Sequence, residues 1–306
     1  MKTAGKFNYE WLAGLLIWAA QLWALKSLPS ESYWVVILLL FSTMVLMPLS
    51  RRLWDSESRQ EWRPKVETGF SIGMAITFFT NSAVEAIPWL LVRSAAAIEA
   101  IRNCTRKTLH DPAELTLVSA RIFPAIGAAW FVAHRANWTP WGFDPLIVLL
   151  TAAHFHHAGF TLPLIAGLNA KANPGKWTRF SCVAILLGVP LVAVGITGTH
   201  FGVFKFVEPF GVAILVLGAL GVAVSQVWRG LERQRSILTR IGFVISGASL
   251  FAAMVLALGF GFRYVIPNFA LTMPQMWAIH GTLNAFGFGL CGILAWRGAV
   301  THSERP

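Results

Sequence analysis

A cluster of histidines lies inside an apolar stretch of this sequence, and imidazole is the side chain best suited to moving protons near neutral pH. His154, His156 and His157 occur within the run 146–167, whose other residues are mostly apolar. At about 100° per residue along a helix, His154 and His157 project from nearly the same side, and His156 points away. Polar side chains are costly inside a bilayer. These imidazoles are therefore expected to meet a protein-lined cavity, a ligand or one another.

The last apolar stretch carries a second polar stripe that includes Gln275, Trp277, His280 and Asn284. His280 and Asn284 are four residues apart, so on a helix they share one face. Glycines at positions 281, 287 and 289 would let a neighbouring helix approach closely. We expect this stripe to face the histidine cluster.

Two charged residues are also predicted to lie within the membrane. Arg121 falls near the middle of an apolar stretch, and it needs a carboxylate, a bound anion or a water-filled pocket as partner. Glu85 is the expected partner, with Asn81 four residues before it. Pro88 follows one turn later and could free backbone carbonyls beside a cavity.

The composition is that of a polytopic membrane protein. Of 306 residues, 56% are hydrophobic and 13% charged, with 14 Trp and 22 Phe. Apolar runs of about 20 residues recur throughout, and no strand-like alternation is present. The predicted fold is an all-α transmembrane helical bundle, residues 1–306 forming one domain in the lipid bilayer. The net charge of +11 is carried mainly by short loops, which argues against nucleic-acid binding.

Ten stretches are predicted to cross the membrane: 11–25, 33–49, 68–81, 84–102, 113–133, 145–167, 180–199, 209–228, 242–262 and 273–296. The stretch 84–102 contains Glu85, Arg93 and Glu99, so nine spans are the alternative. Ten spans place most Lys and Arg residues on the cytoplasmic side, together with both termini, whereas nine spans remove this asymmetry. The first apolar run is interpreted as a retained helix, because the preceding residues lack a cleavable signal.

Several other residues have structural interpretations. Asp144 and Glu208 each precede a proline, which is typical of a helix N-terminal cap. His200 is expected at the membrane interface. Three isolated cysteines indicate neither a disulfide framework nor a zinc site, and are expected to pack as small apolar residues.

Two motifs carry a resemblance to a known family. The segments HFHHAGFTLP (154–163) and HGTLNAFGF (280–288) resemble the YndJ-like family of bacterial integral membrane proteins. The resemblance covers two predicted spans and implies a protein of the bacterial inner (cytoplasmic) membrane, without implying a reaction. A membrane histidine followed by glycine in an aromatic-rich span is also similar to haem-binding membrane proteins of the NnrS type.

The preferred functional hypothesis is a membrane-embedded enzyme that needs no metal or other cofactor. It would isomerise, cyclise or open an epoxide in a lipophilic molecule such as a terpenoid or polyene. Burial favours the neutral form of carboxyl and imidazole groups, so Glu85 could donate a proton and His154 accept one. Arg121 or His157 would steer the developing charge, and His280 completes the catalytic set. The predicted substrate-binding residues are His156, Asn81, Asn284, Trp89, Phe160 and Trp277.

Two alternatives belong to other classes. In the first, His154 or His157 faces His280 and the pair binds haem b as axial ligands. The His-x-His-His spacing matches no common metal motif, which weighs against this hypothesis. The second is a proton-coupled transporter in which the same imidazoles form a relay. The sequence shows no inverted repeat with paired broken helices, and this absence makes a transporter less favoured.

Overall fold

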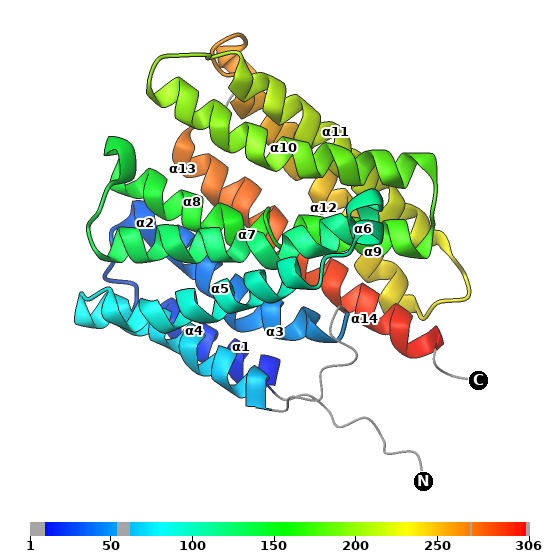
Figure 1. Ribbon diagram of the computed structural model, residues 1–306, viewed down its shortest axis with the longest axis horizontal. Coiled ribbons are helices and arrows are strands. Elements are labelled where there is room, and N and C mark those ends of the chain that lie inside the picture. The colour runs from blue at the N-terminus through cyan, green and yellow to red at the C-terminus, as the bar shows by residue number, and fades with distance from the viewer. Residues whose placement is uncertain (1–9, 54–61, 270, 304–306) are drawn as a thin grey trace.

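The computed structural model describes residues 10–53, 62–269 and 271–303, and over this part of the chain the protein is a helical bundle without strands (Figure 1). The principal elements are α1 (Glu10–Ala24), α2 (Ser30–Phe41), η1 (Ser42–Leu46), α3 (Met47–Ser50), η2 (Arg51–Leu53), α4 (Trp62–Thr80), η3 (Val84–Ala86), α5 (Ile87–Arg102), α6 (Arg106–His110), α7 (Pro112–Arg135), η4 (Pro140–Gly142), α8 (Pro145–His157), α9 (Thr161–Ala172), α10 (Lys176–His200), α11 (Val207–Leu231), α12 (Ile237–Gly261), η5 (Pro267–Phe269), α13 (Met273–Gln275), η6 (Met276–His280), η7 (Leu283–Leu290) and α14 (Cys291–Ser303).

The predicted all-α bundle is confirmed, and each of the ten predicted stretches is largely helical. Seven helical segments of the described chain are long and apolar enough to cross a membrane: Ser32–Leu53, Pro112–Arg135, Pro145–Ala172, Lys176–His200, Val207–Leu231, Ile237–Gly261 and Met273–Val300. Trp11–Ala24 and Val66–Thr80 are shorter apolar helices. The count of ten crossings stays a prediction. So does the cytoplasmic position of the termini, because residues 1–9 and 304–306 lie outside the described part.

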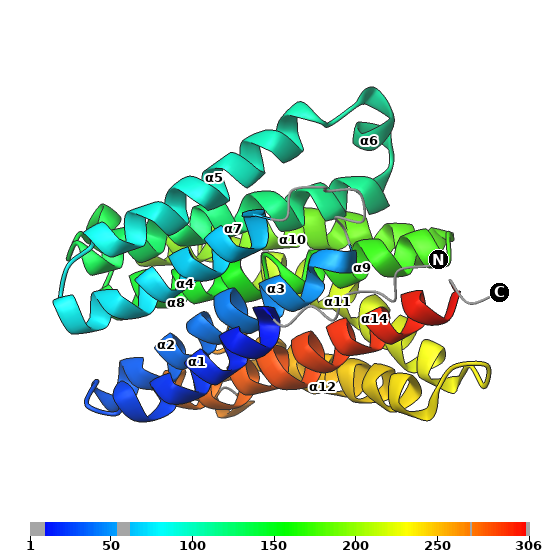
Figure 2. The same ribbon diagram turned by 90° about the horizontal axis from the view of Figure 1, so that it is seen from below.

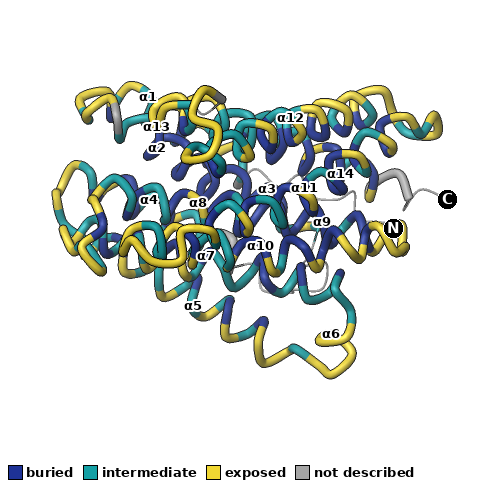
Figure 3. The backbone as a smooth tube through the Cα atoms, turned by 90° about the horizontal axis from the view of Figure 1, so that it is seen from above, coloured by how far each residue is buried: buried dark blue, intermediate teal, exposed yellow. Residues whose placement is uncertain are grey.

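The segment formed by α2, η1 and α3 is the central rod of the bundle. In its most apolar window 83% of the residues are buried, against 33–50% for the other six long segments. Figure 2 shows α1, α12 and α14 along one side and α5 and α6 along the opposite side. The buried tube in Figure 3 is concentrated between these layers. Because polar backbone groups are satisfied within each helix, packing between apolar side chains can fill this interior.

Three of the long segments are irregular, and one of them is the central rod, in which η1 is a π-helical stretch. Between α8 and α9 the helix is interrupted at residues 158–160, directly after the histidines. A Cβ atom at Gly159 would lie 2.6 Å from the carbonyl oxygen of Phe155, so only glycine fits this close turn. The last segment contains two π-helical stretches, η6 and η7, and η6 ends at His280. π-Helical turns are rare and often mark functional sites.

The two predicted caps have different outcomes. Asp144 caps α8 as predicted, since its Oδ1 accepts a hydrogen bond of 2.8 Å from the backbone N–H of Leu146. The prediction for Glu208 is wrong: its buried carboxylate pairs with Arg263 at 2.5 Å and accepts a hydrogen bond of 2.7 Å from Thr199. A buried carboxylate left without a cation is strongly unfavourable, and Arg263 supplies that cation. Glu208 therefore joins the ends of α10, α11 and the segment after α12.

Candidate functional site

His156 is fully buried and uses both ring nitrogens within the protein. Its Nε2 accepts a hydrogen bond of 3.0 Å from Trp89 Nε1, and its Nδ1 donates to the carbonyl oxygen of Ala152 at 2.8 Å. These partners assign the neutral tautomer with hydrogen on Nδ1. Trp89 is itself buried, so the pair forms a rigid contact between α5 and α8. His156 and Trp89, both predicted to bind substrate, bond to each other in this arrangement.

His157 attaches the end of α8 to the central rod. Its Nε2 donates a hydrogen bond of 2.8 Å to the carbonyl oxygen of Leu38, and the hydroxyl of Ser42 donates to the carbonyl oxygen of His156 at 2.5 Å. The Nδ1 atom of His157 is buried and has no partner among the described residues. In the tautomer set by Leu38, this nitrogen is a proton acceptor. The lone pair on Nδ1 of His157 is therefore held in a fixed direction inside the bundle.

His154 differs from its two neighbours. Its side chain forms no hydrogen bond with the described residues, and it is exposed, although residues 152, 153, 156 and 157 are buried. The imidazole nevertheless lies deep among protein atoms. The imidazole is therefore exposed, and many protein atoms lie near it.

The packing of α8 differs from that of α9. α8 packs mainly on α2 and α7, whereas α9, the continuation of the same segment, packs on α7, α10 and α11. The end of α10 returns to the loop before α8 (Figure 1), where the His200 ring lies 4.2 Å from the Phe143 ring. His154 lies near the end of α8 and is exposed. It is also close enough to His157 and His280 for their charges to interact.

His280 is oriented by two neighbours. Its Nδ1 donates to the carbonyl oxygen of Ala253 in α12 at 2.9 Å, and its Nε2 accepts from Asn284 Nδ2 at 3.1 Å. Asn284 lies one turn further on, as the predicted shared face requires. Both nitrogens of His280 are thus engaged in the protein. Trp277, from the same stripe, is buried, as is Phe160 at the helix break.

The predicted acid is placed away from this cluster. Glu85 lies in the turn between α4 and α5, outside both helices, and its charged neighbour is Arg135. Arg135 also donates a hydrogen bond of 3.1 Å to Asn81, which ends α4 with φ +53°. The hydroxyl of Ser82 and the adjacent backbone lower the pKa of the Glu85 carboxyl, so it is ionised at neutral pH. Pro88 lies in the first turn of α5 and does not break a helix, because an N–H group in the first turn has no acceptor within the helix.

Arg121, the other charged residue predicted for the site, is half-buried near the middle of α7. The expected pairing with Glu85 is not the arrangement found, since Arg135 lies beside that carboxylate. The structure thus brings together His154, His157 and His280, with Asn284 behind the last of them. It places Glu85 and Asn81 in a separate polar group at the end of α4.

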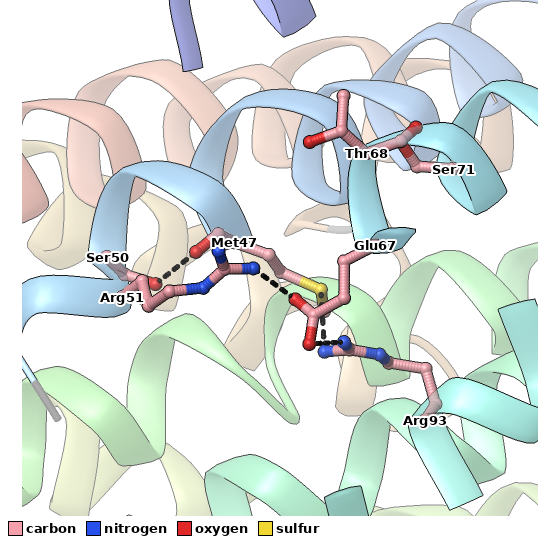
Figure 4. A network of polar contacts seen from close by, with 7 residues as sticks. All are labelled: Met47, Ser50, Arg51, Glu67, Thr68, Ser71 and Arg93. Atoms are coloured by element: carbon pink, nitrogen blue, oxygen red, sulfur yellow. Dashed lines mark hydrogen bonds and ion pairs between the residues drawn. The ribbon is translucent and has the colours of Figure 1, made fainter. Parts of the chain in front are cut away.

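An ion-pair network that the sequence did not reveal supports the histidine cluster (Figure 4). Glu67 Oε2 lies 2.5 Å from Arg51 Nη2, and Glu67 Oε1 lies 2.8 Å from Arg93 Nη2. The Arg93 guanidinium is buried and lies 4.6 Å from the Trp89 ring centroid, and Trp89 in turn bonds to His156. Arg93, within the apolar stretch 84–102, was the feature of the sequence that could have indicated this network. Its partner was hidden because Glu67 directly follows a charged loop in the sequence.

The close packing of α7 against α8 allows the contacts of His156 to be tested. A Cβ atom at Gly127 would lie 2.5 Å from His156 Nδ1 and 3.0 Å from Phe155 Cβ. The ring cannot swing aside without losing its two hydrogen bonds, so Gly127→Ala is expected to destabilise the protein by about 1–3 kcal/mol. Thermal unfolding in detergent measures this. Gly69→Ala is the control, since nothing lies within 4 Å of its Cβ; equal melting temperatures for the two variants would contradict the prediction.

The sequence model of the family described as YndJ-like protein matches residues 37–288, which include both histidine motifs and Glu67. The chain belongs to the YndJ-like family. The membrane protein YndJ of Bacillus subtilis (strain 168) is 30% identical over 216 residues, which are 69% of this chain and 38% of that protein. The YndJ-like chain therefore spans well under half the length of this relative. No solved structure matches this chain.

The resemblance inferred from the two histidine motifs is confirmed, and the chain is a YndJ-like membrane protein. Its site offers one open imidazole at His154, one fixed lone pair on His157 and one oriented imidazole at His280. Such a group can accept and return a proton in an apolar setting. For a haem, His154 is the imidazole with free nitrogens, whereas His280 would have to give up its bonds to Ala253 and Asn284.

Proposed function

We propose that this YndJ-like protein is an enzyme of the bacterial inner membrane that transfers a proton within a lipophilic small molecule, with His154 as the acid–base group. The observation that carries the proposal is the open imidazole of His154 beside two imidazoles whose orientations are fixed by the protein. Because His154 is exposed on a largely apolar helix, a hydrophobic molecule could reach it from the bilayer. The substrate class remains that of a terpenoid, a polyene or a similar conjugated lipid.

An isomerisation suits this arrangement better than a cyclisation or an epoxide opening. The neutral His154 nitrogen would take a proton from a carbon next to a conjugated carbonyl, and the electrons of that C–H bond would move into the conjugated system. The resulting imidazolium would return the proton to another carbon of the same system, so no atom or electron is gained or lost. Opening an epoxide or starting a cyclisation needs a stronger acid, and Glu85 lies ionised in a distant turn.

The neighbouring imidazoles would stabilise the charged step. When His154 becomes an imidazolium, the free Nδ1 of His157 can accept a hydrogen bond from it or attract it electrostatically. His280 is held by Ala253 and Asn284, so its dipole is fixed before the reaction. The Arg93–Trp89–His156 contacts would keep the end of α8 in place.

Haem b binding is the second candidate, since His154 has both nitrogens free to act as an axial ligand. The two proposals differ in what they require of the purified protein. Haem binding predicts a Soret absorption band that is lost on replacing His154. Proton transfer within a substrate predicts activity in colourless protein.

Exchange of hydrogen with solvent tests the enzyme directly. The purified protein in detergent is incubated in deuterium oxide with a total lipid extract of a bacterium that carries a YndJ-like protein, and the extract is then examined by mass spectrometry. We expect one lipophilic species to gain deuterium at a carbon-bound position only when the protein is present. An extract without protein-dependent labelling, or proton flux into proteoliposomes that depends on His154, would reject the isomerase.

A further inference from the structure

A cavity lies near the end of the molecule opposite to the Glu85 turn, between the end of α9, the start of α10 and the end of α11. Its volume is about 550 Å³, and its wall includes Asn169, Lys176, Arg229 and the acidic Glu232. None of these residues belongs to the histidine cluster. The cavity therefore needs an explanation separate from the proposed proton transfer.

Arg229 is a buried cation without a paired carboxylate. Only 7% of its surface is exposed, its Nε donates a hydrogen bond of 3.0 Å to Asn169 Oδ1, and its guanidinium lies 4.6 Å from the Trp296 ring centroid. Glu232 acts on Arg229 electrostatically, but its carboxylate pairs with Arg235 at 2.7 Å. Across the described ranges no acidic side chain forms an ion pair with Arg229. A buried guanidinium in this position is unfavourable unless an anion joins it.

Unpartnered hydrogen-bond donors surround the same guanidinium. Asn169 is 2% exposed and lines the cavity, yet its Nδ2 has no partner in the described chain. The indole Nε1 of Trp296, against which Arg229 stacks, is also buried without a partner there. Arg229 and Asn169 both line the cavity, so a bound group that only accepts hydrogen bonds and carries negative charge would satisfy Arg229 and Asn169 Nδ2 together.

The residues at the mouth of the cavity are typical of the membrane–water interface. The first turn of α10, which begins at Lys176, contributes to the wall, and the N-terminus of this 25-residue helix carries partial positive charge. Trp177 and Trp228 are 57% and 67% exposed and also line the cavity. Tryptophan is enriched at the level of lipid headgroups, and basic pockets between membrane helices bind phosphate-bearing headgroups.

We propose that this cavity binds a phosphate group, a chemistry shared by the headgroup of an anionic phospholipid and by inorganic phosphate. Arg229 and Asn169 would donate to its oxygens from inside, and Lys176 and the start of α10 would face it from the rim. The bound group would neutralise Arg229 and hold the ends of α9, α10 and α11 together.

The test uses the full-length protein in an uncharged, phosphate-free detergent. Phosphatidylglycerol and inorganic phosphate are titrated separately, and binding is followed by tryptophan fluorescence and by native mass spectrometry. We expect Arg229→Gln to weaken binding by about tenfold or more, the loss typical of a charge-assisted hydrogen bond. Asn169→Asp places a carboxylate beside Arg229, so it should leave the fold intact while weakening binding at least as much. Lys171→Ala, which removes an exposed cation paired with Glu114 at 2.9 Å, is the matched control and should bind like wild type.

The outcomes separate the two sources of phosphate. Binding of phosphatidylglycerol alone would assign the cavity to a lipid headgroup, and binding of inorganic phosphate alone would assign it to a solute; either result supports the site if both substitutions weaken it. The proposal is overturned if neither ligand binds the wild-type protein. It is also overturned if folded Asn169→Asp protein binds as tightly as the Lys171→Ala control.

Discussion

Replacing His154 by alanine is expected to lower protein-dependent deuterium incorporation by about 10²–10⁴-fold, the usual contribution of a general acid–base group. The side chain makes no hydrogen bond with the described residues and is exposed, so its removal should leave the fold unchanged. The loss should therefore appear as a lower rate in a protein with the melting temperature of the wild type. The assay is the labelling of the lipid extract in deuterium oxide, followed over time for both proteins.

A second histidine provides the control for this substitution. His200 is exposed at the end of α10, where its Nε2 bonds to the carbonyl oxygen of Trp141 at 3.1 Å. His200→Ala should retain labelling within about threefold of wild type, as is typical of a surface change away from the reacting group. If His154→Ala labels the substrate as fast as His200→Ala, another group moves the proton and the proposed site is incorrect.

Glu67→Gln is expected to lower the free energy of unfolding by up to about 3–5 kcal/mol, the range for breaking a buried ion pair from one side, because Arg93 is buried and Glu67 is largely covered. The change leaves two arginines, Arg51 and Arg93, facing a neutral amide in the interior. Arg93 also holds the Trp89 ring, so the contact between Trp89 and His156 should weaken. Denaturant unfolding in detergent measures the loss of unfolding free energy. The side chain of Trp89 should also become more mobile.

Glu114→Gln is the matched control for that experiment. Glu114 pairs with Lys171 at a similar distance, 2.9 Å, but both side chains are well exposed. Exposed pairs contribute about 0–1 kcal/mol, so this variant should unfold almost like wild type. Equal destabilisation by the two substitutions would show that burial of Glu67 does not matter. The network would then have no special part in holding α4 and α5 against the central rod.

Features that depend on neighbouring residues were predictable from the sequence. The apolar runs predicted the helices, and the cap at Asp144 followed from its position before Pro145. The pairing of His280 with Asn284 followed from their spacing of four residues. The two histidine motifs also led to the correct family. For the cap and for the His280–Asn284 pair the relevant atoms lie within about one helical turn of one another, so local geometry decides the outcome.

Only the tertiary structure decided which imidazole is open and which carboxylate is buried. His157 bonds to Leu38 and His156 bonds to Trp89, partners that are 119 and 67 positions away along the chain. Glu85 was expected inside and lies in a turn, whereas Glu67, beside a charged loop in the sequence, lies between two arginines. Helical periodicity states which residues share a face, but it does not state which other helix covers that face. That choice depends on how all the helices pack together, and it leaves His154 uncovered.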